Sequence, residues 1–325
     1  MAVSRLRRTL LMVACTIAGT AAWAQSFPDR PITWIVPYAA GGGTDFMTRT
    51  VAEQMSKSLG QAVVVENRAG AAGGIGLVAA ARAKPDGYTL VTGENGALTI
   101  NPNFYKKLAY DPVKDLVPIG MFAKIPFLLI VDPARLKVNT LQEFVSYAKA
   151  HPHKLSYGSF GPGSIAHLMG EMFKVRAKID MLAVPYKGAA PAIQDFLGGQ
   201  IDAIFVDYAV AKAFIDQGRM KALAVTTRER SFALPEVPTF QESGVPDYDV
   251  ASWMGLMAPA GTTAGAIERL TKALSAALEA SELKATFAGR GILIDAANAT
   301  EFSDRINKDL AKWSAVVRDA KIERE

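Results

Sequence analysis

Cysteine is nearly absent from this sequence, and histidine is scarce. Cys15 is the only cysteine in 325 residues, and there are three histidines. No H-E-x-x-H pattern occurs, so a zinc ion would have to be held by scattered histidines and carboxylates, and we expect no metal site. A G-x-S-x-G nucleophile elbow is also missing. The sequence therefore gives catalysis little support, and we expect a protein that is not an enzyme and has no cofactor.

Long apolar runs are missing as well. The stretch from Leu10 to Ala22 is apolar and uncharged, but it is shorter than the roughly 20 residues that span a bilayer. It follows a basic start with three arginines and ends in a small-x-small pattern at Ala24. Residues 1–24 are therefore predicted to be a signal peptide cleaved after Ala24, and the mature chain is expected in the periplasm. A lipid anchor on Cys15 is the less favoured alternative, because only six uncharged residues precede it.

Neither sign of charge dominates the mature chain. Without the three arginines of residues 1–24, 33 basic side chains face 31 acidic ones, a formal net charge of +2, and the charges are scattered. This pattern argues against a nucleic-acid partner. With no cysteine after residue 24, the chain cannot depend on disulfides. A mature length near 300 residues therefore predicts about two domains held by ordinary hydrophobic cores.

Strand-like and helix-like segments alternate along the chain. The expected strands are residues 32–36, 62–65, 88–92, 127–131, 155–158, 182–186, 201–206, 223–226 and 250–258. The expected helices include residues 46–59, 77–83, 263–278 and 301–317, one that begins after a capping-box pair at Thr140 and Glu143, and one that begins at Ser164. Strands joined by helices predict right-handed crossovers and mostly parallel sheets covered on both faces. The pattern indicates two α/β units.

A glycine-rich loop follows the first expected strand. Three glycines and a following helix N-terminus can direct several backbone N–H groups at one anion, without any lysine or arginine. The candidate binding residues of this loop are Tyr38, Ala40, Gly41, Gly42, Gly43, Thr44 and Asp45. The alternative is a plain turn in which Thr44 or Asp45 serves as the helix N-cap.

A second loop of this kind follows the strand at 155–158, in the other α/β unit. Its candidate binding residues are Ser159, Gly161, Gly163, Ser164 and His167, although Ser164 could also act purely as a helix cap. Ligands of open α/β sheets lie outside the carboxyl ends of strands, so two such loops predict a clamp between the units. Asp207, at the end of another strand, is a further candidate, with helix capping as the alternative.

A third loop, residues 66–76, also follows a strand. Gly74, Gly76 and Ala79 match a G-x-G-x-x-A dinucleotide fingerprint, but eight residues separate Val65 from Gly74 where a dinucleotide-binding turn would be tight. We interpret the loop as a turn stiffened by Arg68 paired with a nearby acid.

Several motifs together resemble one family, the substrate-binding proteins of tripartite tricarboxylate transporters, also called Bug proteins. The motifs are Phe27-Pro28-Asp29-Arg30-Pro31-Ile32, Val36-Pro37-Tyr38, Ala40-Gly41-Gly42-Gly43-Thr44-Asp45, Val65-Glu66-Asn67-Arg68, Pro85-Asp86-Gly87-Tyr88-Thr89-Leu90, Val184-Pro185-Tyr186-Lys187-Gly188, Gly198-Gly199-Gln200-Ile201-Asp202 and Ala258-Pro259-Ala260-Gly261-Thr262. The resemblance implies an α/β, two-lobed type II periplasmic binding protein fold. It implies crossings between the lobes near residues 122–126 and 249–254, with residues 25–124 plus 251–325 as lobe 1 and 125–250 as lobe 2.

The resemblance also implies a function. Such a receptor captures a small carboxylate between its lobes and delivers it to the membrane subunits of its transporter, and we expect it to be a monomer. The ligand could be a dicarboxylate, a tricarboxylate, an acidic amino acid or an aromatic acid. The loop after the third strand departs from the family pattern, and Glu94 or Asn95 there could bind an amino or hydroxyl group. A periplasmic sensor that serves a signalling kinase and a dinucleotide-dependent enzyme are the alternatives.

Overall fold

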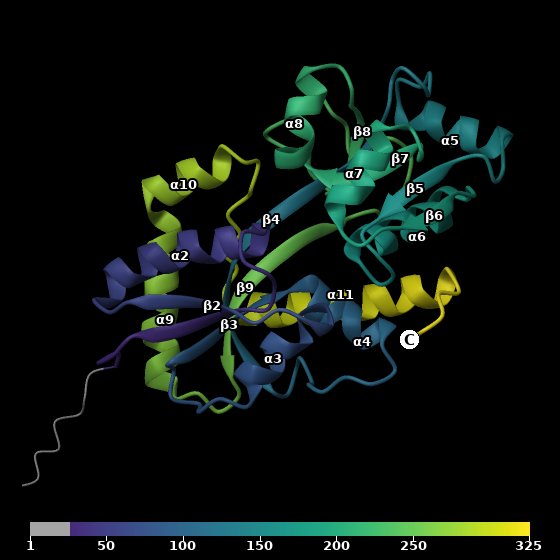
Figure 1. The fold of residues 1–325 in the computed structure, drawn as a ribbon. Helices are drawn as coiled ribbons and strands as arrows, with labels where there is room; N and C mark the ends of the chain where they lie inside the picture. The colour runs from purple at the N-terminus through teal and green to yellow at the C-terminus, as the bar shows by residue number, and fades with distance from the viewer. Residues whose placement is uncertain (1–26) are drawn as a thin grey trace, which may run out of the picture.

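The computed structural model describes residues 27–325 and has two lobes connected by long strands (Figure 1). The predicted signal peptide and its cleavage site after Ala24 lie outside the described residues. Within the described part of the chain, no helix combines the length and the apolar character needed to cross a membrane.

The strands of both lobes are connected in one continuous hydrogen-bonded array. The strands are β1 (Ile32–Val36), β2 (Val63–Asn67), β3 (Thr89–Glu94), β4 (Leu116–Val131), β5 (Ser156–Ser159), β6 (Leu182–Pro185), β7 (Ala203–Asp207), β8 (Lys221–Val225) and β9 (Ala251–Pro259). Their order is β2-β1-β3-β9-β4-β7-β5-β6, with β8 also paired to β4. Strands β2, β1, β3 and β9 belong to the first lobe, β7, β5, β6 and β8 to the second, and β4 to both.

Most strands of each lobe run in one direction, as predicted. In the first lobe β1, β2 and β3 are parallel, β9 is antiparallel to β3, and β4 is antiparallel to β9. In the second lobe β5, β6 and β7 are parallel, and β4 is antiparallel to both β7 and β8. The strand of opposite direction is therefore β9 in one lobe and β4 in the other. Both are strands that arrive from the neighbouring lobe, so the two expected crossings are confirmed.

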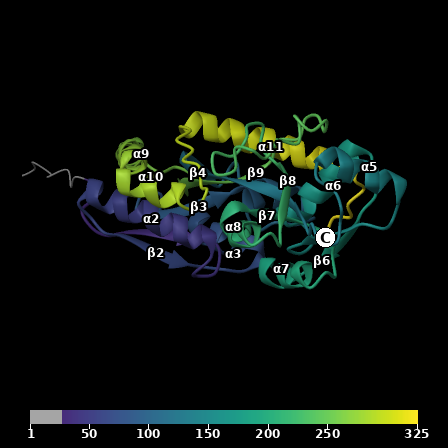
Figure 2. The same cartoon turned by 90° about the horizontal axis from the view of Figure 1, so that it is seen from above.

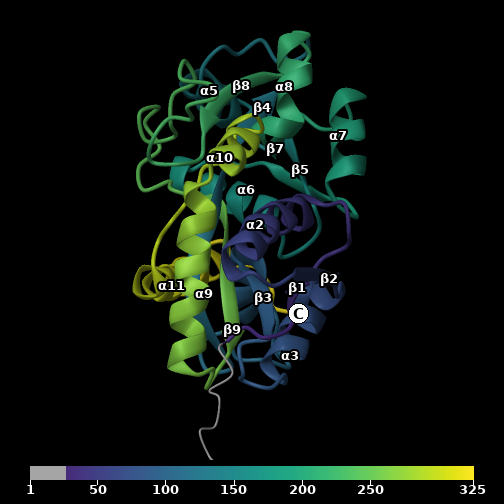
Figure 3. The ribbon, with the colours of Figure 1, turned by 90° about the vertical axis from the view of Figure 1, so that its left-hand side faces the viewer.

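The connection between the lobes is a pair of long antiparallel strands. β4 is paired with β9 from Leu116 opposite Pro259 to Pro126 opposite Ala251, with register shifts near Pro118 and Met121. Figure 3 shows β9 running lengthwise from the upper lobe into the lower one. The sequence predicted only residues 127–131 of β4. Its first part carries two prolines, which normally argue against a central strand; Pro118 lies at a bulge, and Pro126 is paired opposite Ala251.

Helices cover both faces of each lobe. They are α2 (Gly43–Leu59), α3 (Gly74–Ala81), α4 (Asn101–Phe104), α5 (Leu141–Ala150), α6 (Ile165–Ala177), α7 (Ala189–Leu197), α8 (Tyr208–Asp216), α9 (Ala264–Glu279), α10 (Ser281–Ala288) and α11 (Ala299–Asp319), with the single turns η1 (Ala71–Gly73) and η2 (Gly96–Ile100), the latter a π-helix. Helices α2, α9 and α10 pack on one face of the first lobe, and α3 packs on the other. In the second lobe α5 and α6 face α7 and α8 across the sheet.

Strand residues alternate between the two cores, as the two-residue period of a strand requires. In β4, Leu128 and Ile130 enter the core shared with α7 and α8, whereas Leu129 and Val131 enter the opposite core. The central strands of each lobe are therefore buried on both faces, in agreement with the apolar strands read from the sequence, whereas the edge strands β2 and β6 are partly exposed.

The last helix, α11, contributes to the cores of both lobes. Phe302 and Ile306 in its first half belong to a core of the first lobe, and Trp313 and Val317 in its second half belong to a core of the second. Figure 2 shows α11 lying lengthwise along one side of the molecule. A capping box at its start joins the Asn298 side chain to the first-turn N–H groups, and this fixes the point where the helix begins.

The predicted helix starts are confirmed in two places. Thr140 caps α5 by accepting from the Glu143 N–H at 3.1 Å, and Ser164 caps α6 by accepting from the His167 N–H at 3.2 Å. The capping box at the start of α5 is incomplete, because the Glu143 carboxylate accepts from the Asn139 N–H instead of that of Thr140.

Candidate functional site

A cavity of about 450 Å³ lies between the two lobes, at the carboxyl ends of β1, β3 and β5. Its lining residues are Tyr38, Thr44, Ala72, Glu94, Gly96, Asn101, Tyr105, Phe160, Pro162, Gly163, Ser164, Ile165, Ser252 and Met254. Both predicted glycine loops therefore reach the same cavity from different lobes. Of the predicted site residues, Tyr38, Thr44, Gly163 and Ser164 line it directly.

The start of α2 supplies backbone donors to the first loop. The N-cap is Gly42, which has no side chain to cap the helix, so the alternative in which Thr44 or Asp45 is the N-cap is wrong. The first N–H groups of a helix have no intrahelical acceptor and carry partial positive charge. Because no side chain caps α2, these N–H groups are open to a ligand next to Thr44.

Asp45 shapes this loop from behind. Its carboxylate is buried and accepts from the Gly41 N–H, Arg49 Nε and Asn67 Nδ2, each at 2.9 Å. Burial alone would raise the pKa of Asp45, but these hydrogen bonds outweigh it and hold the pKa below its ordinary value. Asp45 is therefore an ionised side chain that holds the loop in place, and it does not line the cavity.

The second loop is arranged around the start of α6. Ser164 caps the helix through its hydroxyl, and His167 Nδ1 accepts from the Gly163 N–H at 3.3 Å. Burial lowers the pKa of His167, which favours the neutral ring that this hydrogen bond needs. His167 points back to its own loop, whereas the N–H group of Ile165, which lines the cavity, has no acceptor within the helix.

Gly163 also makes a close approach across the cavity. Its backbone has φ +69°, and an added Cβ would lie 2.7–2.9 Å from the ring of Phe104, which follows β3 in the first lobe. Glycine is therefore required here both by its conformation and by its neighbour. The two lobes touch at this point.

Ser159 has a hydroxyl without a partner. It is 1% exposed at the end of β5, and no hydrogen-bond partner for its Oγ occurs among residues 27–325. Buried hydroxyl groups are normally hydrogen-bonded, so this one needs an acceptor that the described chain does not provide.

Tyr38 and Glu94 meet at the first-lobe side of the cavity. The Tyr38 hydroxyl donates to the Glu94 carboxylate, which also accepts from the N–H groups of Gly96 at 3.0 Å and Ala97 at 2.8 Å. Burial and the adjacent Glu94 charge raise the pKa of Tyr38 well above its ordinary value. Gly73, with φ +90°, leaves room for this hydroxyl, since a Cβ there would lie 3.1 Å from it.

Two other predicted residues have structural partners. Asn95 is buried and donates from Nδ2 to the Ala251 carbonyl at 3.1 Å, and its Oδ1 accepts from the Ser252 hydroxyl at 3.3 Å. Asp207 caps α8 by accepting from the Val210 N–H at 3.1 Å, and burial raises its pKa. Both side chains lie outside the cavity lining, and the capping interpretation of Asp207 is confirmed.

Ten predicted site residues therefore do not line the cavity directly. They are Ala40, Gly41, Gly42, Gly43, Asp45, Asn95, Ser159, Gly161, His167 and Asp207. Most of them belong to the two loops and set the loop shape. Sequence reasoning did not place these lining residues in the site: Ala72, Gly96, Asn101, Tyr105, Phe160, Pro162, Ile165, Ser252 and Met254. The one available signal was the Asn-Pro pair at residues 101–102 of the loop after β3.

The third loop has a packing role. Arg68 pairs with Glu66 at 2.9 Å, as expected, and both side chains are exposed. Gly76 sits against Pro37, where a Cβ would be 2.7 Å away, so this glycine serves helix packing. Ala71 and Ala72 have φ of +47° and +49°. Residues other than glycine rarely adopt this conformation, and those that do are often found at functional sites. Ala72 lines the cavity, and its carbonyl accepts from Asn101 Nδ2 at 2.9 Å.

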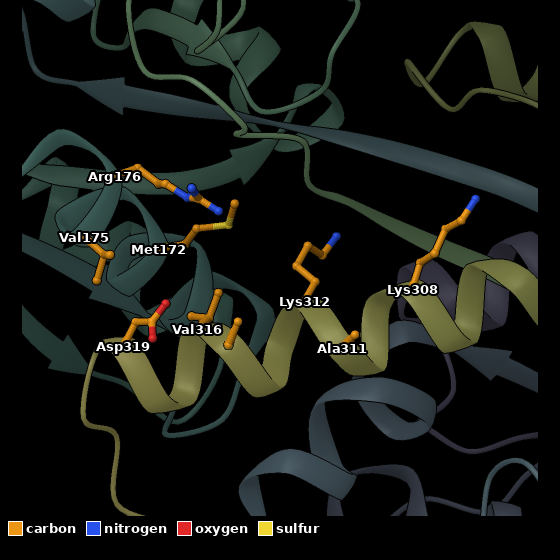
Figure 4. A pocket seen from close by; sticks show the side chains of 9 residues that line it. Met172, Val175, Arg176, Lys308, Ala311, Lys312, Val316 and Asp319 are labelled. Atoms are coloured by element: carbon orange, nitrogen blue, oxygen red, sulfur yellow. The ribbon is translucent and has the colours of Figure 1, made fainter.

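A second cavity, of about 380 Å³, lies between α6 and α11. Figure 4 shows Lys308 and Lys312 on α11 across from Met172 and Arg176 on α6. Lys312 is paired with Asp309 at 2.8 Å, and Arg176 with Asp247 at 3.6 Å. No strand end or glycine loop reaches this cavity within residues 27–325, so we place the candidate site between the lobes. Across the same residues, no group of three His, Cys, Asp or Glu side chains could hold a metal ion.

Comparison with known proteins identifies the family of this chain. The pattern of the family described as "Tripartite tricarboxylate transporter family receptor" matches residues 47–322. Protein BugT of Bordetella pertussis is 36% identical over 297 residues, 91% of each chain. A "UPF0065 protein in tcbD-tcbE intergenic region" of Pseudomonas sp. strain P51 is 34% identical over 315 residues, which cover 96% of this chain and 93% of the relative.

Solved structures share the same fold. Rpa4515 of R. palustris with adipate has a TM-score of 0.81 at 32% identity and covers 92% of this chain and 100% of its own. MatC of Rhodopseudomonas palustris with bound malate has a TM-score of 0.76 at 32% identity, with 90% and 100% covered. The periplasmic binding protein BugD has a TM-score of 0.78 at 34% identity, with 92% and 100% covered. The match over most of its length shows that this chain belongs to the tripartite tricarboxylate transporter receptor family of solute-binding proteins.

Proposed function

We propose that this protein captures a small carboxylate in the cavity between its lobes and delivers it to the membrane subunits of a tripartite tricarboxylate transporter. One observation carries the proposal: the starts of α2 and α6 reach a single cavity from opposite lobes. Helix N-termini bind carboxylates through backbone N–H groups, so an anion there contacts both lobes. Relatives solved with adipate and with malate support this class of ligand.

The ligand's charge drives closure of the lobes in this proposal. An anion that contacts both helix starts binds the closed arrangement of the lobes more strongly than the open one. A ligand shifts the equilibrium between the two arrangements only by such a difference in affinity. We place lobe 1 at residues 25–124 plus 251–325 and lobe 2 at 125–250. We place the receptor in the periplasm as a monomer, after cleavage of the predicted signal peptide behind Ala24.

Two serines provide a matched test of the site. Ser159 and Ser243 are both buried, and neither hydroxyl has a hydrogen-bond partner within residues 27–325. Only Ser159 lies at the end of a strand that faces the cavity. If its hydroxyl donates to the bound carboxylate, Ser159→Ala weakens binding by about 1.5–3 kcal/mol, the range for hydrogen bonds to charged groups. Ser243→Ala leaves the affinity unchanged.

The measurement begins with a thermal-shift screen of carboxylates on residues 25–325. At 100 times its dissociation constant, a true ligand stabilises the fold by about 2.7 kcal/mol. Calorimetric titration of the best acid then compares the two serine variants with the wild type. A screen in which no carboxylate raises the melting temperature would refute the proposed function, and equal affinities in the two variants would remove Ser159 from the site.

A further inference from the structure

We propose that Glu94 makes this receptor selective for acids whose far end carries an ammonium group or a neutral hydrogen-bond donor, and selects against a second carboxylate there. The inference rests on the proposed function, because it concerns the other end of the same ligand. It assigns a substrate class: ω-amino acids and similar zwitterions, with neutral-ended monocarboxylates as weaker ligands.

Glu94 sets the charge of the cavity. Among the lining residues found within 27–325, it is the one charged side chain, and none of them is lysine, arginine or histidine. No ion pair to Glu94 from a basic side chain occurs in the same residues. A ligand held by the uncharged helix starts at one end therefore meets a formal negative charge at the other.

The hydrogen bonds of Glu94 remove the donors that a second carboxylate would need. Three donors converge on its carboxylate: the Tyr38 hydroxyl and the N–H groups of Gly96 and Ala97. A carboxylate has about four acceptor positions, so roughly one remains for a ligand donor. At this end of the cavity the protein provides the Glu94 carboxylate, which can accept a hydrogen bond from a ligand.

The Glu94 carboxylate is held in place. Tyr38 and Ala97 both donate to Oε1, and Gly96 donates to Oε2, so both oxygens are fixed. The raised pKa of Tyr38 keeps its hydroxyl protonated, and hence a donor, across the physiological range. The Gly96 backbone lies so close that an added Cβ would be 2.6 Å from Oε1. Rotating Glu94 away to admit a second carboxylate would break three hydrogen bonds at once.

The expected selectivity is large. The effective dielectric constant of protein sites is about 20. At that value, the interaction between two unit charges about 6 Å apart changes a dissociation constant by roughly 100-fold, downward for opposite charges and upward for like charges. Replacing a terminal carboxylate by an ammonium group exchanges repulsion for attraction. We therefore expect the ω-amino acid to bind at least about 100-fold more tightly than the dicarboxylate of equal length.

The test uses pairs of acids that differ only at the far end. The probes are succinate with 4-aminobutyrate, glutarate with 5-aminopentanoate, adipate with 6-aminohexanoate, and terephthalate with 4-(aminomethyl)benzoate. Calorimetric titration at pH 7 measures each pair on the wild type, on Glu94→Gln, and on Glu66→Gln. The last variant makes the same change of charge on an exposed strand residue outside the cavity.

The inference predicts a preference for the amino member in the wild type and in Glu66→Gln. In Glu94→Gln that preference falls by at least about tenfold, while the carboxylate shared by both members still binds. A wild type that binds dicarboxylates as tightly as their amino partners overturns the inference and leaves the proposed function standing. An amino preference that survives in Glu94→Gln overturns the assignment to Glu94. If no probe of either kind binds the wild type, the proposed function fails, and this inference fails with it.

Discussion

Gly163→Ala tests whether contact between the lobes at the cavity controls ligand binding. An ordinary residue in the left-handed conformation of Gly163 costs about 1–2 kcal/mol. The new methyl group would also press on the ring of Phe104, which is 2% exposed and cannot move into solvent. Overpacking of this kind costs about 1–3 kcal/mol. The two lobes can relieve that second cost by separating, so it should weaken ligand binding.

Gly218→Ala is the matched control. Gly218 has φ +71°, almost the same as Gly163, but a Cβ there would meet nothing within 4 Å. We expect both variants to lose a similar free energy of unfolding in urea. Only Gly163→Ala should also lose affinity for the best acid from the screen, by about 5- to 150-fold, the equivalent of 1–3 kcal/mol.

A double-mutant cycle shows whether Phe104 is the cause. In a Phe104→Ala background the methyl group has nothing to press on, so Gly163→Ala should weaken binding no further than Gly218→Ala does. Calorimetric titration of the four combinations measures the coupling directly. An affinity loss that is equal in the two glycine variants, or that persists without the Phe104 ring, would refute the reasoning.

Three more predictions concern stability. Because the pKa of His167 is lowered in the folded state, the free energy of unfolding should fall as pH drops below about 6.5, and His167→Gln should reduce that slope in urea titrations from pH 8 to 5. Asp45→Asn should lower the free energy of unfolding by about 1.5–3 kcal/mol at pH 7. Because the pKa of Asp45 is lowered in the folded state, the difference in free energy of unfolding from the wild type should shrink only as pH falls below about 4. Trp253→Phe removes the 2.7 Å hydrogen bond from Nε1 to the buried Asp309 carboxylate, and thermal unfolding should report a loss of about 2–4 kcal/mol; a loss under 1 kcal/mol would contradict this.

Most of the secondary structure could be predicted from local signals. Strands such as β1 are short β-branched runs, and α2 carries apolar residues four apart and ends at Leu59 before Gly60, as expected. The first half of β4 could not be predicted. Pro118, Gly120 and Pro126 are residue types typical of loops, and the sequence alone does not show that this segment pairs with β9. A strand is stabilised by its neighbour, and that neighbour lies more than 120 residues away in sequence.

The candidate site was predictable as a pair of loops, and much less so as individual side chains. Gly-rich segments after two strands indicated where the cavity lies. Which side chains face the cavity depends on hydrogen-bond partners that are distant in sequence. Asp45 is bonded to Asn67 and Asn95 to the Ala251 carbonyl, and neither side chain lines the cavity. The Glu94 arrangement was also out of reach, because it depends on the π-helical turn after β3 and on a hydroxyl 56 residues earlier.

The helix α11 has a consequence for the order in which the protein assembles. The strands of the second lobe come from the middle of the chain, yet the core of this lobe includes Trp313 and Val317 from the last helix. Domains usually fold in turn from the N-terminus as the chain emerges. Here the core of the second lobe lacks one of its fully buried side chains, Trp313, until the last helix has been made. The cores of both lobes are therefore complete only once α11 has been made.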